Sequence, residues 1–208
     1  MVRAGTCAIA ALLLCVSGFA QVIEFESGGL KYQTLTKGGI TIMFAHLPSQ
    51  VREYSIIQVA VSNGSTEPWV VRPEEFRFEL TNGAVIQAVP ALQVINQLIR
   101  HANGDDVIKL VTTYEMGLYG MTRIHSTNGY EKRRQSALAV VSSQRLKAAE
   151  AASAIALVET RLAPGETTDG AVFYPTFGRT IGESRMKVYS SSGLLFEFEP
   201  STPQWAAK

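Results

Sequence analysis

Histidines and paired carboxylates are the residues of this chain that could transfer protons or bind a metal near neutral pH. The three histidines are spread over a strand end, a helix end and a loop, at His46, His101 and His125. They do not form the ligand pairs that are typical of a zinc site. We therefore expect structural or solvated histidines, and we expect neither a metal nor a cofactor.

Two acidic pairs are the remaining candidates for acid–base chemistry. Glu74 and Glu75 follow Pro73, which indicates a solvated loop, while Asp105 and Asp106 come just before a helical pattern and suit its cap. The sequence has neither a G-x-S-x-G nucleophile elbow nor a phosphate-binding loop. A hydrolase of envelope polymers built on these four carboxylates stays an alternative.

The first twenty residues have the pattern of a secretory signal peptide. Arg3 supplies a positive start, residues 8–14 form a short apolar run, and residues 18–20 provide small side chains for cleavage after Ala20. The apolar run is shorter than the roughly 20 residues that span a bilayer. A lipid anchor at Cys15 is not expected, because the residue before a lipidated cysteine is normally small and here it is leucine.

Cleavage after Ala20 changes the cysteine content and the net charge of the chain, and both bear on its compartment and partners. Both cysteines, Cys7 and Cys15, leave with it, so the exported part has no disulfide. The full chain carries a net charge of +1, and losing Arg3 brings this to zero, which argues against a nucleic-acid partner. No later segment is apolar enough to be read as a transmembrane span. We expect a bacterial periplasmic or secreted protein.

The stretch from Tyr54 to Val71, YSIIQVAVSNGSTEPWVV, is the one around which the strands are organised. Its apolar residues alternate, which predicts a half-buried central strand, then a turn at residues 63–65 and a short strand with Trp69 as aromatic anchor. Further short strands are predicted before and after it. Residues 81–83, Thr-Asn-Gly, join two of them in a hairpin, since Asn-Gly is the strongest hairpin signal.

Helical spacing replaces alternation between about residues 90 and 153. Leu92, Ile95 and Leu98/Ile99 recur at helical intervals, and an alanine-rich helix is predicted over residues 130–153. Strands resume after it. The sequence thus predicts a mainly β protein, α+β by count, with one β-sandwich domain over residues 21–200. The helical insertion lies against one edge or end, and a frayed tail covers residues 201–208.

Four short motifs carry a resemblance to a known family. They are Val61-Ser62-Asn63, Phe76-Arg77-Phe78, Pro164-Gly165-Glu166 and the segment Gly170 to Phe173. Together they resemble secreted bacterial immunoglobulin-like β-sandwiches of uncharacterised function. The resemblance covers the strands and not the helical block. It implies a fold and a compartment rather than an activity.

Two groups of residues are candidates for contacting a partner. The first is a glycine-flanked loop of flexible apolar and aromatic side chains, which suits an adaptable surface: Met116, Leu118, Tyr119, Met121, Ile124 and Tyr130. Packing of this loop onto the sandwich is the alternative. The second is a basic patch that could meet phosphate or an acidic partner: Arg123, Lys132, Arg133 and Arg134. A solvated helix face is the alternative here.

These observations favour an exported, non-catalytic binding or structural module of the bacterial cell envelope, whose partner is an unknown protein or envelope component. An assembly component that pairs through a free sheet edge is a further alternative.

Overall fold

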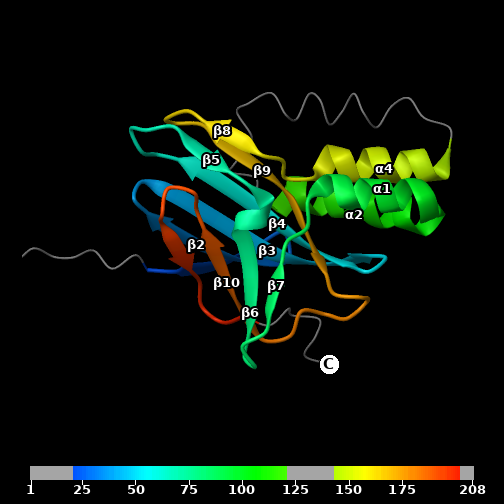
Figure 1. Ribbon diagram of the computed structural model, residues 1–208, viewed down its shortest axis with the longest axis horizontal. Coiled ribbons are helices and arrows are strands. Elements are labelled where there is room, and N and C mark those ends of the chain that lie inside the picture. Colours follow the sequence, from blue (N-terminus) through cyan, green and yellow to red (C-terminus); the bar gives the residue numbers. More distant parts are fainter. Residues whose placement is uncertain (1–20, 121–142, 202–208) are drawn as a thin grey trace, which may run out of the picture.

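The computed structural model describes residues 21–120 and 143–201, and it is mainly β (Figure 1). All strand pairs in its sheets are antiparallel. The largest sheet has the order β1-β2-β3-β4-β9. Its strands are β1 (Ile23–Ser27), β2 (Leu30–Lys37), β3 (Ile40–Val51), β4 (Tyr54–Asn63) and β9 (Thr167–Pro175).

A four-stranded sheet of order β11-β10-β6-β7 packs on one face of the five-stranded sheet. It consists of β6 (Phe76–Leu80), β7 (Val85–Gln87), β10 (Ser184–Tyr189) and β11 (Leu195–Glu197). The predicted hairpin at residues 81–83 is confirmed, because β6 pairs with β7 across it. A third sheet joins β5 (Trp69–Val71) to β8 (Thr160–Leu162), and a short 3₁₀ helix, η1 (Pro73–Glu75), leads into β6.

The layer between the two larger sheets is closed by aromatic side chains. Phe44 on β3 meets Phe78 on β6 with ring centroids 6.2 Å apart and Phe198 at 5.0 Å, both edge to face. Trp69 is partly buried and meets Phe196 at 6.3 Å, as expected of an aromatic anchor. We call this layer the sheet-side core.

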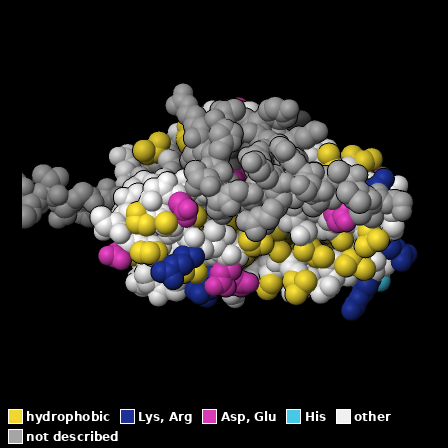
Figure 2. Space-filling model, turned by 90° about the horizontal axis from the view of Figure 1, so that it is seen from above, with side chains coloured by type: hydrophobic (Ala, Val, Ile, Leu, Met, Phe, Trp, Pro, Cys, Tyr) yellow, Lys and Arg dark blue, Asp and Glu magenta, His cyan; other side chains and the backbone are white. Residues whose placement is uncertain are grey.

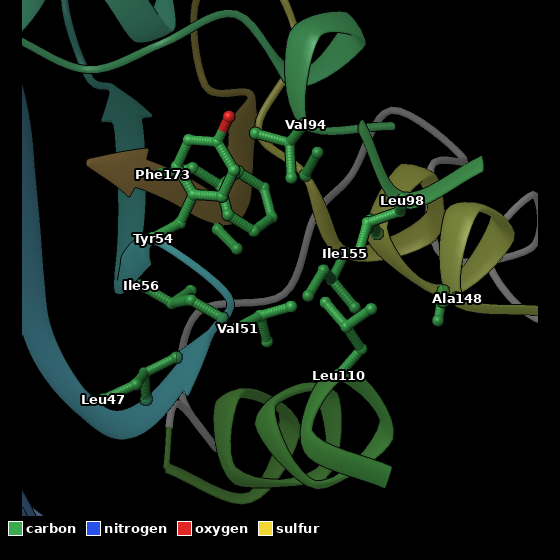
Figure 3. Close-up of a cluster of buried hydrophobic side chains, with 14 of the residues drawn as sticks. Leu47, Val51, Tyr54, Ile56, Val94, Leu98, Leu110, Ala148, Ile155 and Phe173 are labelled. Carbon is green, nitrogen blue, oxygen red and sulfur yellow. The ribbon is translucent and has the colours of Figure 1, made fainter. Parts of the chain in front are cut away.

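Helices cover the opposite face of the five-stranded sheet (Figure 1). They are α1 (Ala91–His101), α2 (Gly104–Gly120) and α4 (Gln144–Ile155), and they come between β7 and β8 in the chain. Figure 3 shows how their side chains meet those of the sheet: Val94 and Leu98 from α1, Leu110 from α2 and Ile155 from α4 approach Val51, Tyr54 and Ile56. We call this layer the helix-side core.

β4 is therefore buried on both faces, which corrects the prediction of a half-buried strand. Val59 and Val61 face the sheet-side core, whereas Ile56 and Ala60 face the helix-side core. Even Gln58 is only 5% exposed. The prediction was wrong because it placed the helices at an edge or end of the sandwich, and they lie over a face.

Alanines explain how three helices fit over this sheet. α4 contacts both α1 and α2, and its buried side chains are mostly methyl groups, including Ala148, Ala151 and Ala152. Small side chains let helices approach one another closely. The described part of the predicted helix over residues 130–153 is helical from Gln144 and ends two residues later than predicted, at Ile155.

The buried face of α1 agrees with the prediction at Ile95 and Leu98 but not at Leu92. Val94 and Leu98 are buried, while Leu92 is 65% and Ile99 is 43% exposed. Two apolar stripes overlap on this helix, and only the stripe that meets the sheet is covered. The sequence shows both stripes but not the direction from which the sheet approaches.

The chain remains in strand pairing beyond Pro48 and is still paired at Ser201. β3 continues past Pro48 to Val51 because a register shift between His46 and Gln50 accommodates the proline. Ser201, predicted to begin a frayed tail, exchanges backbone hydrogen bonds with Ser184 at 2.9 and 3.1 Å. Residues 202–208 lie outside the described part of the chain.

Asn63, at the end of β4, joins three segments that are distant in sequence. Its side chain is fully buried and donates to the carbonyls of Glu67 (2.8 Å) and Leu162 (3.1 Å), while its Oδ1 accepts from the backbone N–H of Ser65 (3.0 Å). Its backbone N–H donates to Glu166 O at 2.9 Å. The residue thus holds the turn after β4, the end of β8 and the loop before β9 together.

Replacing Asn63 by alanine is expected to lower the free energy of unfolding by about 2–4 kcal/mol, because the buried carbonyl of Leu162 and the partly buried carbonyl of Glu67 lose their donor. Urea unfolding followed by circular dichroism measures this. Asn82→Ala is the matched control, since the Asn82 side chain accepts from the exposed backbone N–H of Ala84 (2.9 Å) in a turn. Equal losses in the two variants would contradict the joining role of Asn63.

Candidate functional site

An open groove of about 580 Å³ runs between α1 and the turn that joins β3 to β4. Most of its lining residues carry a polar group, although their stems and rings also expose apolar surface: Glu53, Tyr54, Pro90, Leu92, Gln93, Asn96, Gln97, Arg100 and His101. Figure 2 shows hydrophobic side chains gathered over the helical half of the molecule, beside basic ones at its end. We call the groove between α1 and the β3–β4 turn the α1 groove.

Tyr54 connects the α1 groove to the core beneath it. Its ring packs edge to face on Phe173 in the helix-side core, with centroids 6.4 Å apart. Its hydroxyl interacts with the side chains of Glu53 and Gln93, and burial together with the Glu53 charge raises the pKa of Tyr54 to about 12. The phenol therefore stays protonated at neutral pH and acts as a hydrogen-bond donor rather than a base.

The polar stripe of α1 forms one wall of the groove. Gln93, Asn96 and Gln97 lie three and four residues apart, which places their amides on one side of the helix. The Oε1 of Gln97 is buried without a hydrogen-bond partner in the described structure. Amides both donate and accept without titrating, so this wall suits a ligand that carries both kinds of group.

Charges of both signs lie within the same groove. Glu53 comes from the β3–β4 turn, and Arg100 and His101 come from the last turn of α1, where the helix dipole favours cations. The expected position of His101 at a helix end is thus confirmed. Sequence reasoning did not find this groove, because its two walls lie almost forty residues apart and only the fold brings them together.

Most of the predicted interaction loop is outside the described residues. Met116 lies in α2 rather than in a loop, and it packs against the helix-side core. Leu118 and Tyr119 belong to α2 by their backbone, while their side chains are not described. Met121, Ile124 and Tyr130 lie outside the described part of the chain. For Met116 the packing alternative holds.

The structure does not describe the predicted basic patch or the third histidine. Arg123, Lys132, Arg133 and Arg134, together with His125, all lie outside the described residues. The structure therefore leaves the basic patch as a prediction.

The acidic pair of η1 is tied to the sheet next to it. One carboxylate oxygen of Glu75 accepts the backbone N–H of Ser191 at 3.0 Å and lies 3.6 Å from a guanidinium nitrogen of Arg72. Burial raises the pKa of Glu75, and the hydrogen bonds from Ser191 and Arg72 offset part of this. Glu74 contributes its backbone carbonyl to the Gln87 side chain at 3.2 Å.

The second acidic pair works as a helix cap, with a change of residue from the prediction. Asn103, not Asp105, caps α2: its Oδ1 accepts the backbone N–H of Asp106 at 3.0 Å. The Asp106 carboxylate in turn accepts the backbone N–H of Asn103 at 2.9 Å, and it pairs with Arg52 at 3.2 Å. This reciprocal arrangement is a capping box. The ion pair also fastens α2 to the β3–β4 turn.

His46 sits inside the fold rather than in the α1 groove. Its ring stacks on Phe78 at 5.2 Å, and its Nε2 lies 3.4 Å from the Ser201 hydroxyl. Burial lowers the pKa of His46 to about 4. Within the described residues, no group of three or more His, Cys, Asp or Glu side chains is arranged to hold a metal ion.

The low pKa of His46 makes stability depend on pH in one direction. Between pH 6.5, the ordinary pKa of histidine, and pH about 4, His46 is protonated in the unfolded chain but neutral in the folded protein. Stability is therefore expected to fall as pH falls through this range, by at most about 1.4 kcal/mol per pH unit. Urea unfolding at several pH values measures the slope.

His46→Gln should flatten that slope, whereas His101→Gln, which changes an exposed histidine on α1, should keep it. An unchanged slope in the His46 variant would show that the lowered pKa of His46 does not cause the pH dependence of stability.

No described helix has the length and apolar character needed to cross a membrane. No family model matches the chain, and no curated protein matches it. Among solved structures it is similar to the crystal structure of the yjhA protein from Bacillus subtilis, at 8% identity and a TM-score of 0.34 over 84% of this chain and 93% of that one. A likeness at this score carries no argument about fold or function.

Proposed function

We propose that this protein is an exported, non-catalytic binding module of the bacterial cell envelope, and that the α1 groove is its binding site. The observation that carries the proposal is the groove itself: amides, a protonated phenol and charges of both signs line an open space over a well-packed core. Such groups orient a polar ligand. The amides and the phenol do not supply a general base at neutral pH.

The proposed scaffold is an immunoglobulin-like sandwich. The order β3-β4-β9 facing β11-β10-β6-β7 corresponds to strands A-B-E facing G-F-C-C′ of that fold. In this assignment the hairpin strands β1 and β2 extend the first sheet beyond strand A. The helices and β8 occupy the chain between C′ and E, where strand D normally lies.

Export rests on the signal-peptide pattern of residues 1–20. The first described strand begins at Ile23, three residues after the proposed cleavage position, so removal of residues 1–20 leaves every described strand and helix intact. The cysteine-free remainder suits an oxidising compartment without needing a disulfide.

A second candidate function, pairing with an assembly partner through a free sheet edge, is favoured by one observation. β1 is the last strand of the five-stranded sheet, and two of its apolar side chains are exposed. Edge strands of this kind accept an additional strand.

Expression of the full chain in a Gram-negative host is expected to give a periplasmic protein whose intact mass corresponds to a start at Gln21. Ala20→Arg should leave the precursor uncleaved, because a bulky charge at this position blocks signal peptidase. Cys15→Ser is the control and should change nothing. A mature protein that begins at Cys15 and partitions into membranes would instead indicate lipidation.

The binding site is tested by sedimenting the purified exported protein with washed, detergent-free envelope fragments. Asn96→Ala combined with Gln97→Ala is expected to raise the half-saturating concentration roughly tenfold, since each lost hydrogen bond costs about 0.5–1.5 kcal/mol. Arg145→Ala is the matched control, because Arg145 is exposed on α4 and does not line the groove. Equal binding by all three proteins would exclude the α1 groove as the site.

A further inference from the structure

One edge of the five-stranded sheet is closed and the other is open. Beyond β9, the backbone N–H of Val89 donates to Phe173 O at 2.9 Å and that of Leu157 donates to Ala171 O at 2.8 Å. Gly170 makes this approach possible, because a Cβ there would lie 2.5 Å from the Leu157 nitrogen. At the opposite edge, β1 (dark blue in Figure 1) pairs within the described structure only with β2.

The register of the β1–β2 hairpin shows which backbone groups the open edge presents. Gly28 and Gly29 have φ of 58° and 75°, the positive values of a two-residue type I′ turn. Ser27 and Leu30, which flank this turn, therefore form a hydrogen-bonded pair, and so do Phe25 and Tyr32 two residues further along. The N–H and C=O groups of Glu24 and Glu26 consequently point outward.

The two faces of β1 differ in chemistry. Ile23 and Phe25 are 58% and 41% exposed on the face shared with the helix-side core, where Phe25 stacks on Tyr32 at 5.3 Å. Glu24 and Glu26 are exposed on the other face. Gln33 donates to Glu24 at 2.6 Å, and Lys31 is the register partner of Glu26.

Charge argues against a second copy of the chain at this edge. An antiparallel pair centred on Phe25 places Glu24 of each strand opposite Glu26 of the other, and a pair centred on either glutamate places it opposite itself. Like charges directly opposite one another destabilise a sheet. A basic residue at the same place would instead leave Glu26 between two cations, with Lys31 on its other side.

We propose that the open edge of β1 takes up an extended segment of a partner protein in which basic residues alternate with apolar ones. The backbone of Glu24 and Glu26 supplies the ladder hydrogen bonds, the two carboxylates select the basic side chains, and Ile23 and Phe25 receive the apolar ones. The inference rests on the second candidate function, edge pairing, and is independent of the α1 groove.

The test uses the ¹⁵N-labelled exported protein and two acetylated, amidated hexapeptides, one of alternating Lys and Val and one of alternating Glu and Val. In the free protein, the Phe25 amide should exchange slowly and those of Glu24 and Glu26 quickly. The Lys/Val peptide should slow exchange at Glu24 and Glu26 at least tenfold, and the Glu/Val peptide should not. Added salt should weaken the effect.

Charge reversal provides the decisive variant. Glu24→Lys with Glu26→Lys is expected to exchange the preference, so that the Glu/Val peptide protects positions 24 and 26. Slow exchange at Phe25 in this variant verifies that the β1–β2 hairpin persists. Arg145→Glu, a charge reversal on α4, is the control and should retain the original preference.

Three results would overturn the inference, and they differ in what they leave standing. Equal protection by both peptides removes the basic partner but keeps edge pairing. Protection by neither peptide removes edge pairing as well. Protection of positions 24 and 26 that rises with protein concentration alone, together with a dimer in light scattering, replaces the basic partner with a second copy.

Discussion

Burial of β4 and β9 on both faces of the five-stranded sheet is the constraint on which the rest of this structure depends. A strand covered on one side needs an apolar residue only at every second position, whereas β4 must pack each side chain against either a sheet or a helix. This requirement explains the small residue at Ala60, which faces the helices, and the branched residues Val59 and Val61, which face the second sheet. It also explains why the helical block is part of the core and not an appendage.

The junctions around this sheet are held by directional polar contacts, whereas its two faces are covered by non-directional apolar packing. Asn63 joins the end of β4 to two later segments, and Arg52 with Asp106 joins the β3–β4 turn to α2. Hydrophobic burial supplies most of the free energy of folding but is not directional. Directional bonds of this kind determine where each loop and helix sits, and hence where the walls of the α1 groove meet.

Both proposed interaction sites arise where this packing stops. The α1 groove lies where α1 passes the β3–β4 turn, and the open edge lies where β1 ends the sheet. The two sites differ in chemistry, since the groove offers side-chain amides and charges while the edge offers backbone groups flanked by two glutamates. A protein with both could hold a polar ligand and a partner strand at the same time.

The sequence by itself determined the mainly β class, the hairpin at residues 81–83, and the helical character of the block before β8, because turn chemistry and periodicity act over a few neighbouring residues. Of the candidate site, it indicated only that His101 ends a helix. The tertiary structure decided that β4 is covered on both faces, that Val94 and not Leu92 is buried, and that Tyr54 meets Gln93. Each of these depends on which face of the sheet the helices cover, and that choice is made by contacts between residues far apart in the chain.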